Sequence, residues 1–186
     1  MSAPAVSLIL TTARLRLEPC DDRHFEGMHA LNADAEVMRY ITGQPETREQ
    51  TAAVIARVKA RWVRFGYSWW SFIEPATEEL VGIGCIQNLR RSGTEPDPSC
   101  PMEIGWRLRR DRWHRGLATE ASVALARFAF DKLDAPELYA VCDAENLASA
   151  AVMERLGMRR RGIERWYERD LLTYTMTPEE FAARHP

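Results

Sequence analysis

Between a strand-like run at 102–108 and an amphipathic run at 117–133, the chain reads Arg112-Trp113-His114-Arg115-Gly116-Leu117-Ala118-Thr119-Glu120-Ala121. The first turn of a helix has backbone N–H groups without intrahelical partners, and its dipole favours negative charge. Gly116 allows the backbone to approach a bulky anion, and Arg109, Arg110, Arg112 and Arg115 surround the turn. The loop is therefore predicted to bind pyrophosphate, although a plain strand-to-helix connection with solvated arginines fits the same residues. Neither G-x-x-x-x-G-K-[ST] nor G-x-G-x-x-G occurs at this loop, which excludes two better-known phosphate loops.

Working outward from this loop, the flanking patterns predict a mixed sheet. Residues 68–73 and 80–87 flank a turn-rich break and predict a hairpin, and the proline-rich residues 88–101 predict a loop. Strands are expected near 15–17, at 102–108, at 138–142 and twice within 158–176. Helices are expected from Asp21 or Asp22, from Asp34, from Thr47 to Gly66, at 117–133, from Asn146 to Gly157 and from Thr177. This order predicts one α/β domain over residues 1–186, with helices on the faces of the sheet and a core at about 8–183.

Composition limits the possible functions. The 186 residues include 25 basic and 27 acidic side chains, for a net charge of −2, which argues against a general nucleic-acid binder. The four cysteines are far apart and the four histidines lack a ligand spacing, so neither a zinc site nor another metal site is expected. Residues 1–10 lack a secretory signal and no apolar run is long enough to span a membrane, so a cytoplasmic location is expected. No feature predicts an oligomeric state.

Several segments, in order along the chain, resemble the RimJ/RimL branch of the GNAT superfamily of N-acetyltransferases. Glu103-Ile104-Gly105-Trp106-Arg107-Leu108 and Trp113 to Ala121 resemble its cofactor-binding segments. Asn146-Leu147-Ala148-Ser149 is similar to its N-x-x-S motif, and Met153 to Met158 to its E-K-L-G-F motif. The similarity also includes Leu10 to Leu17 and Asp170 to Tyr174, and covers roughly residues 8–183. Two residues depart from the pattern: Trp113 replaces the usual glutamine or arginine of Q/R-x-x-G-x-G/A, and His114 stands where the branch most often has glycine.

The resemblance implies a GNAT-like fold, in which a mostly antiparallel sheet has helices on both faces and a splayed parallel strand pair holds acetyl-CoA. That pair would be 102–108 and 138–142. Backbone groups of Ile104, Trp106 and Leu108 would bond the pantetheine arm. The pyrophosphate would lie against the loop made of Arg112, Trp113, His114, Arg115, Gly116, Leu117, Ala118 and Thr119. Asn146, which also suits a plain helix cap, and Ser149 would reach the cofactor from the end of the second strand.

Acetyl transfer to an amine needs a base for the amine, a donor for the carbonyl oxygen and protonation of the leaving thiolate. Glu103 is the candidate base, because partial burial beside the cofactor would raise its pKa, although a surface glutamate fits the same position. The resemblance implies Ser149 as the thiolate-side donor and the N–H of Trp106 as the oxyanion donor; Ser149 also suits an ordinary first helical turn. Glu120 is expected to serve the helix dipole rather than the reaction.

The acceptor amine is the least determined feature of the sequence. Tyr40, Trp69, Trp70, Trp166 and Tyr167 are candidates to line its site, although aromatic residues at such positions also suit a core. The resemblance favours a protein or peptide N-terminal α-amine. A small amine such as a polyamine or aminoglycoside, which would require an acidic site, stays open, as does a non-catalytic acyl-CoA sensor. Release of coenzyme A distinguishes an enzyme from a sensor.

Overall fold

The computed structural model describes residues 8–186, so the expectation for residues 1–7 lies outside the described part. One sheet has the strand order β1-β2-β3-β4-β5-β6-β8-β7. Its strands are β1 (Leu10–Thr11), β2 (Arg16–Pro19), β3 (Trp69–Glu74), β4 (Glu79–Asn88), β5 (Met102–Leu108), β6 (Leu138–Cys142), β7 (Arg159–Trp166) and β8 (Arg169–Met176). The helices are α1 (Phe25–Asn32), α2 (Ala35–Met38), α3 (Arg48–Phe65), α4 (Leu117–Leu133), α5 (Leu147–Leu156) and α6 (Pro178–Arg184), with short 3-10 turns η1 (Asp22–His24) and η2 (Arg110–Arg112).

Local capping determines several helix ends, as the sequence predicts. The side chain of Thr47 accepts a hydrogen bond from the backbone of Gln50, whose own side chain accepts from the backbone of Thr47, and this reciprocal pair begins α3. Gly66 ends that helix with φ +76°, a conformation that favours glycine. Thr177 and Glu180 form the same reciprocal cap at α6. The expected α/β fold with a mixed sheet is confirmed.

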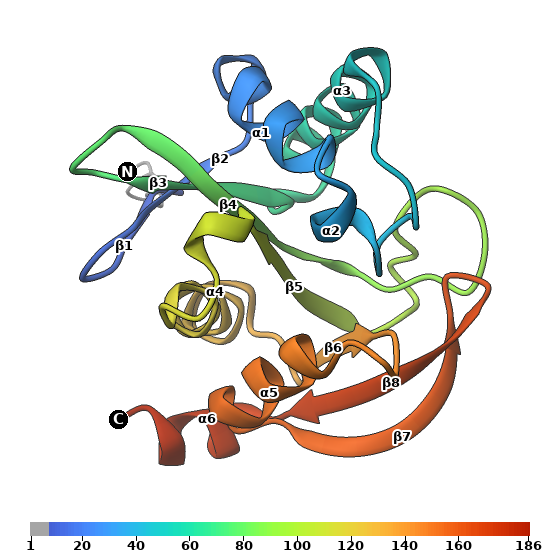
Figure 1. Cartoon of the computed structure of the whole chain (residues 1–186). Helices are drawn as coiled ribbons and strands as arrows, with labels where there is room; N and C mark the ends of the chain where they lie inside the picture. Colours follow the sequence, from blue (N-terminus) through green and yellow to red (C-terminus); the bar gives the residue numbers. More distant parts are fainter. Residues whose placement is uncertain (1–7) are drawn as a thin grey trace.

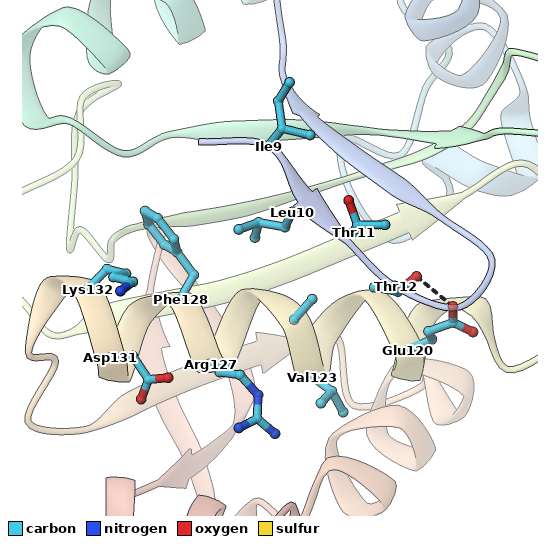
Figure 2. Close-up of a pocket in the computed structure, with 11 residues that line it drawn as sticks. Ile9, Leu10, Thr11, Thr12, Glu120, Val123, Arg127, Phe128, Asp131 and Lys132 are labelled. Carbon is cyan, nitrogen blue, oxygen red and sulfur yellow. Dashed lines mark hydrogen bonds between the residues drawn. The ribbon is translucent and has the colours of Figure 1, made fainter. Parts of the chain in front are cut away.

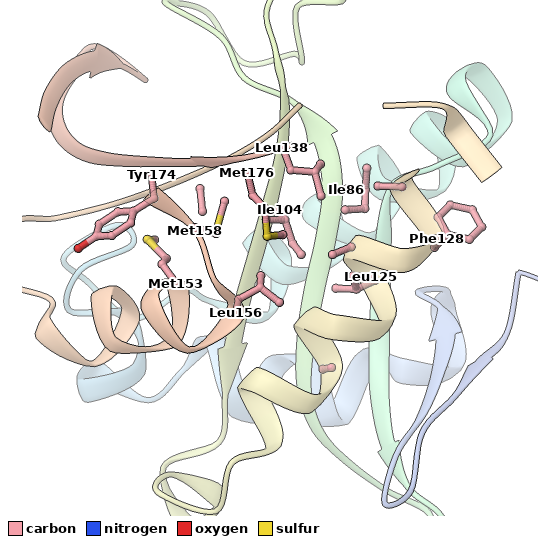
Figure 3. Packing of buried hydrophobic residues seen from close by; sticks show 14 of the residues in the cluster. Ile86, Ile104, Leu125, Phe128, Leu138, Met153, Leu156, Met158, Tyr174 and Met176 are labelled. Carbon is pink, nitrogen blue, oxygen red and sulfur yellow. The ribbon is translucent and has the colours of Figure 1, made fainter. Parts of the chain in front are cut away.

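Helices cover both faces of the sheet (Figure 1). α1 contacts β4 from one side and α4 contacts β4 and β5 from the other. Gly84 on β4 allows this second contact, because a Cβ there would lie 2.5 Å from Phe72 and 2.9 Å from Leu125 of α4. Leu125 packs with Ile104 and Leu138 in the core between α4 and the sheet, which Figure 3 shows. α4 is thereby fixed against the strands that precede its N-terminal loop.

Among the described strands only β5 and β6 run parallel, and they separate after a short contact. Their register pairs Met102 with Leu138 and Glu103 with Tyr139, and within residues 8–186 no further pair joins them. Beyond that point β5 remains paired with β4, as far as Leu108 opposite Gly82. β6 remains paired with β8. The predicted splayed parallel pair is confirmed, and the edge of β5 that faces β6 is left without a strand partner from residue 104 onward.

Two of the five aromatic residues expected at the acceptor site belong to the core instead. Trp70 is fully buried, packs edge-on against Trp62 and Phe128, and donates its indole N–H to the carbonyl of Leu8 at 2.7 Å. Trp166 is also buried and donates its indole N–H to Glu164. The prediction that Trp70 and Trp166 line the acceptor site is therefore wrong, because the interior of the protein encloses both rings.

Candidate functional site

A cavity of about 460 Å³ opens on the sheet where β5 and β6 separate. Its size lies in the range of small-molecule sites. Strands β4, β5 and β6, the start of α5, and the segment after α2 all contribute to its wall. Six residues predicted for catalysis or acceptor binding line it together: Tyr40, Trp69, Glu103, Trp106, Ser149 and Tyr167. Chain segments that are far apart in sequence thus bring the predicted polar and aromatic groups into one hollow.

Glu103 is the central acidic group of this cavity. It is buried, and its Oε2 accepts hydrogen bonds from the Gln87 side-chain amide at 2.9 Å and from the Tyr167 hydroxyl. Gln87 is oriented in turn, because its Oε1 accepts the indole N–H of Trp69 at 3.0 Å and an indole nitrogen can only donate. Within the described residues, both bonds of the carboxylate fall on Oε2. Oε1 is therefore available to a ligand or a water molecule.

Burial raises the pKa of Glu103, because removal from water disfavours the charged carboxylate. The hydrogen bonds from Gln87 and Tyr167 and the positive charge of Arg90 act in the opposite direction and lower this pKa. The net shift is upward. A carboxylate with a raised pKa is a stronger base than an exposed glutamate, as general-base chemistry near neutral pH requires.

The separated edge of β5 carries unpaired backbone groups. Arg109 N–H bonds to Val81 O, and Leu89 N–H bonds to Pro101 O, both at 2.9 Å. Bonded pairs alternate along an antiparallel ladder, so the odd-numbered residues of β5 bond to β4. Ile104, Trp106 and Leu108 consequently direct their backbone groups towards the gap beside β6. Leu108 differs from the other two, because its carbonyl accepts the Trp113 indole N–H at 2.9 Å.

The loop before α4 presents backbone N–H groups in the way its sequence predicts. Gly116 is the N-cap of α4 with φ +75°, and no side chain among residues 8–186 caps the helix there. The first intrahelical bond runs from Glu120 N–H to Gly116 O at 3.0 Å, which leaves the N–H groups of Leu117, Ala118 and Thr119 outside the helical ladder. His114 has φ +60° although it is not glycine. Positive φ at His114 and Gly116 gives this loop a concave backbone.

Most arginines near this loop are already paired with acidic side chains. Arg112 bonds Glu74, Glu79 and Asp111, and Arg109 bonds Glu79 and Asp111. Arg110 lies 3.7 Å from Asp34. In the described part of the chain Arg115 has no such partner for its exposed side chain. The expected positive potential of the loop is therefore concentrated at Arg115, while Arg109 and Arg112 attach the loop to the β3–β4 hairpin.

Asn146 and Ser149 lie together at the start of α5, beside the end of β6. The Asn146 side-chain oxygen accepts the backbone N–H of Ser149 at 3.1 Å, which caps the helix. Both residues line the cavity that contains Glu103. The expectation that Asn146 is a helix cap is confirmed.

A second hollow, of about 620 Å³, lies between β1 and α4 (Figure 2). The carboxylate at its loop end, Glu120, accepts hydrogen bonds from the Thr12 hydroxyl at 2.6 Å and from the Arg14 backbone and side chain. These bonds lower the pKa of Glu120. Glu120 is thus a structural acid that attaches the first turn of α4 to the β1–β2 turn, in keeping with its expected non-catalytic role.

A family model described as "Acetyltransferase (GNAT) domain" matches residues 14–159. The chain belongs to the GNAT family. The match begins in the turn before β2 and includes β5, the loop with Gly116, and α5. This GNAT chain is an acetyl-CoA-dependent N-acetyltransferase, and the separated strands and the open helix start are the elements that such an enzyme requires.

Individual relatives agree with this assignment. The uncharacterized N-acetyltransferase YnaD of Bacillus subtilis is 28% identical over 153 residues, which cover 82% of this GNAT chain and 84% of YnaD. The structure of a GNAT-family acetyltransferase from Bacillus anthracis is 25% identical with a TM-score of 0.75, and covers 92% of this chain and 99% of that one. RimL, a ribosomal L7/L12 α-N-protein acetyltransferase in complex with coenzyme A, has a TM-score of 0.73 at 17% identity, over 91% of this chain and 97% of its own. At that identity RimL shows a shared fold only.

The residues of this enzyme fit coenzyme A. The unpaired edge of β5 suits an extended arm with amide groups, and the concave loop with three available N–H groups suits a diphosphate. In residues 8–186 no group of three or more histidine, cysteine or acidic side chains is placed to hold a metal ion. Nor does any helix in that range have the length and apolar character needed to cross a membrane.

The cavity residues that sequence reasoning missed include Gln87, Arg90 and Arg107. Gln87 faces Glu103 across the β4–β5 pair, so a register prediction for the two strands would have identified it. The sequence pattern gives Arg107 no role beyond a strand position, although its alternation with Glu103 places both on one face. Arg90 lies in the proline-rich segment, where no pattern indicates a position.

Proposed function

We propose that Glu103 is the general base that removes a proton from the acceptor amine. The observation that carries the proposal is the state of its carboxylate. The group is buried and its pKa is raised; Oε2 accepts two hydrogen bonds, while Oε1 is available in the cavity. Acetyl-CoA supplies the acetyl thioester. Tyr40 and Trp69 line the same cavity as Glu103, and the acceptor amine is proposed to bind among these residues. Direct transfer and transfer through one water molecule both satisfy this geometry.

The remaining roles follow from the backbone of β5 and the start of α5. The N–H of Trp106 points into the gap beside β6 and is proposed as the donor to the carbonyl oxygen. The backbones of Ile104 and Leu108 are proposed to flank the pantetheine arm. The hydroxyl of Ser149 lines the cavity and is proposed to donate to the departing sulfur. The alternative, in which Ser149 serves only the first turn of α5, predicts no kinetic effect when its hydroxyl is removed.

The diphosphate is proposed to lie on the N–H groups of Leu117, Ala118 and Thr119, with Arg115 as the nearby cation. The other residues predicted for this loop, Arg112 to His114, would then shape the loop rather than contact phosphate through their side chains, because Arg112 and Trp113 already have partners. Asn146 is proposed to reach the cofactor while it caps α5. With these assignments, the proposed acetyltransferase domain has its core over about residues 8–183.

For the acceptor we propose a protein or peptide N-terminal α-amine, as in the RimJ/RimL branch, in a cytoplasmic enzyme whose four cysteines stay as free thiols. Polyamines and aminoglycosides are cations and would meet three arginines in a wall that is not predominantly acidic, since Arg90, Arg107 and Arg169 line the cavity with Glu46, Glu103 and Asp143. Coenzyme A release with acetyl-CoA and an amine library tests the proposal. Turnover with peptides and small amines alike would reject the peptide preference, and no turnover with any amine would reject the activity.

Tyr167→Phe tests the network around Glu103. Loss of the hydroxyl removes a hydrogen bond that lowers the pKa of Glu103, so this pKa should rise further. A base works only when deprotonated. The acidic limb of the kcat/KM profile should therefore move to higher pH, with the plateau rate less affected than the limb.

Ser149→Ala is a matched control for Tyr167→Phe. The carboxylate of Glu103 is bonded to Gln87 and Tyr167, and Ser149 does not contribute to the shift of its pKa. The acidic limb of Ser149→Ala should therefore stay in place, whatever happens to its rate. An unmoved limb in Tyr167→Phe would remove Tyr167 from this role.

A further inference from the structure

Arg107 is a cation in the cavity that the acetyl-transfer assignments leave unused. Its guanidinium donates to the Met38 sulfur at 3.1 Å and lies 5.4 Å from the centre of the Trp69 ring. Among residues 8–186 no carboxylate lies within 4.0 Å of it, whereas Arg109 and Arg112, on the same side of the molecule, are each paired with acids. A thioether is a weak acceptor. Arg107 therefore holds several N–H donors without a strong partner.

The surroundings of Arg107 disfavour the charged form of its side chain. Burial lowers the pKa of its guanidinium to about 10, and the negative charge of Glu46 only partly offsets this. Glu46 is itself bonded to the Asn32 side chain at 2.8 Å. The Arg107 side chain is half-buried and opens onto the cavity, and a bidentate carboxylate is the ligand that best matches a guanidinium.

The floor of the cavity between Arg107 and Glu103 leaves room for a ligand. Side chains alternate along a strand, so Glu103, Gly105 and Arg107 share one face, and the two charged residues are about 13 Å apart along the strand. Gly105 lies between Glu103 and Arg107 and pairs with Cys85 of β4. The floor of the cavity between the two charged residues therefore carries only small side chains. A Cβ at Gly105 would already lie 3.0 Å from the Cys85 sulfur. The cavity therefore continues from the proposed base to the guanidinium without a bulky side chain on the floor.

The other charged groups of the cavity do not compensate Arg107. Asp143 is paired with Arg169 at 3.1 Å, and Arg169 also donates to the carbonyls of Tyr40 and Ile41. Arg90 lies over the Tyr167 ring and bonds the Gly93 carbonyl. Glu103 is assigned to the amine. Glu46 and Asp143, the other acidic residues of the cavity wall, thus have polar partners of their own.

We propose that Arg107 binds a carboxylate of the acceptor, so that the preferred acceptor is a primary amine with an anionic group several bonds away. The amine lies at Glu103, the chain of the acceptor crosses Gly105 and Cys85, and the carboxylate lies at Arg107 beside Trp69. An acidic second residue of a peptide and a free amino acid whose carboxylate lies several methylene groups from its amine both carry this chemistry. The inference rests on the proposed function, because it uses Glu103 to position the amine.

The test compares acceptors that differ only in charge. C-terminally amidated tripeptides with glycine first and Asp, Asn or Lys second, together with free 6-aminohexanoate and its amide, are assayed by coenzyme A release. Wild type should favour the Asp peptide over the Asn peptide by about tenfold in kcat/KM, the range expected for a charge-assisted hydrogen bond. Arg107→Gln should abolish that preference through KM and leave the Asn peptide unaffected. Activity with 6-aminohexanoate but not with the Asp peptide would assign the carboxylate to a free amino acid.

Two measurements separate the possible failures. Thermal unfolding of Arg107→Gln should show a Tm no lower than that of wild type, since no ion pair is lost; Arg160→Gln, which removes an exposed arginine of β7, controls for net charge. Calorimetry of the same peptides with the coenzyme A complex reads binding without turnover. If no amine is acetylated, the proposed function fails, and the binding comparison still decides the role of Arg107. Equal affinity for Asp and Asn peptides, or an equal loss for both in Arg107→Gln, would overturn the inference.

Discussion

Glu103→Gln should lower kcat by roughly 10²-fold or more at neutral pH, the range typical of the loss of a general base. Glutamine has nearly the same shape and can still accept the bonds from Gln87 and Tyr167, but it cannot take up a proton at Oε1. The affinity for acetyl-CoA should stay unchanged, because the proposed cofactor contacts come from the backbone of β5 and the loop before α4. Steady-state kinetics and calorimetry with coenzyme A measure the two quantities separately.

The pH dependence gives a stricter test of the same variant. Burial raises the pKa of Glu103 in the folded chain, so the wild-type rate should fall as the pH decreases through that raised value and the carboxylate becomes protonated. Glu103→Gln should lack this limb. A profile that keeps the wild-type limb would remove Glu103 from the mechanism.

The thermal stability of Glu103→Gln serves as the control. The expected sign of the change in Tm follows from the raised pKa of Glu103. A carboxyl group whose folded pKa is raised favours folding below its unfolded pKa, and this contribution is lost as the pH rises through the folded pKa. At pH 7 the buried carboxylate is thus a destabilising group that neutral glutamine removes. The Tm of Glu103→Gln at pH 7 should equal or exceed that of wild type. A lower Tm would mean that lost activity reports unfolding rather than chemistry.

Local signals made much of the fold predictable. The reciprocal cap of Thr47 and Gln50, the glycine end at Gly66 and the start of α4 after Gly116 depend on residues that are neighbours in the chain. Their physical causes, unpaired helix ends and backbone conformations open to glycine, act within a few residues. The parallel pair and its separation were expected only through family resemblance, because strand pairing joins distant segments.

The candidate site was less predictable where side chains from distant strands meet. Trp69 and Trp70 are neighbours on β3, and alternation places one in the cavity and the other in the core. Since β3 is buried on both faces, its composition does not reveal which face is which. Gln87 and Arg107 gain their importance from the β4–β5 register, which places one beside Glu103 and the other four residues along the same face.

The charge of the loop near Gly116 was also only partly predictable from sequence, because distant residues pair with its arginines. Their clustering in sequence predicts a positive loop, but Glu74 and Glu79, about thirty residues or more upstream, neutralise Arg109 and Arg112. The groups that remain to bind a diphosphate are mainly the backbone N–H groups of the loop, together with the side chain of Arg115. Binding of coenzyme A should therefore depend more on the conformation of the loop than on any arginine within η2.

Gly116→Val should weaken coenzyme A binding by about 100-fold, because two lost hydrogen bonds to a charged group correspond to roughly 3 kcal/mol or more. The cause is conformational. At φ +75° a β-branched residue is strained, and the chain would relieve the strain by rotating the peptide units that orient Leu117 and Ala118. Space is not the limit, since the nearest atom to a Cβ at Gly116 is the Arg14 guanidinium at 3.6 Å. Isothermal titration with coenzyme A measures the loss.

Gly66→Val is the matched control for this strain. Gly66 has φ +76°, a Cβ added to it would meet no described atom within 4 Å, and it ends α3 on the other face of the sheet from α4. Both variants should lose stability by a similar amount, since both place valine in the left-handed region. Only Gly116→Val should lose affinity for coenzyme A. If the two variants bound coenzyme A equally well, the diphosphate would not lie on the amides that follow Gly116, and the concave backbone at His114 and Gly116 would be a structural turn alone.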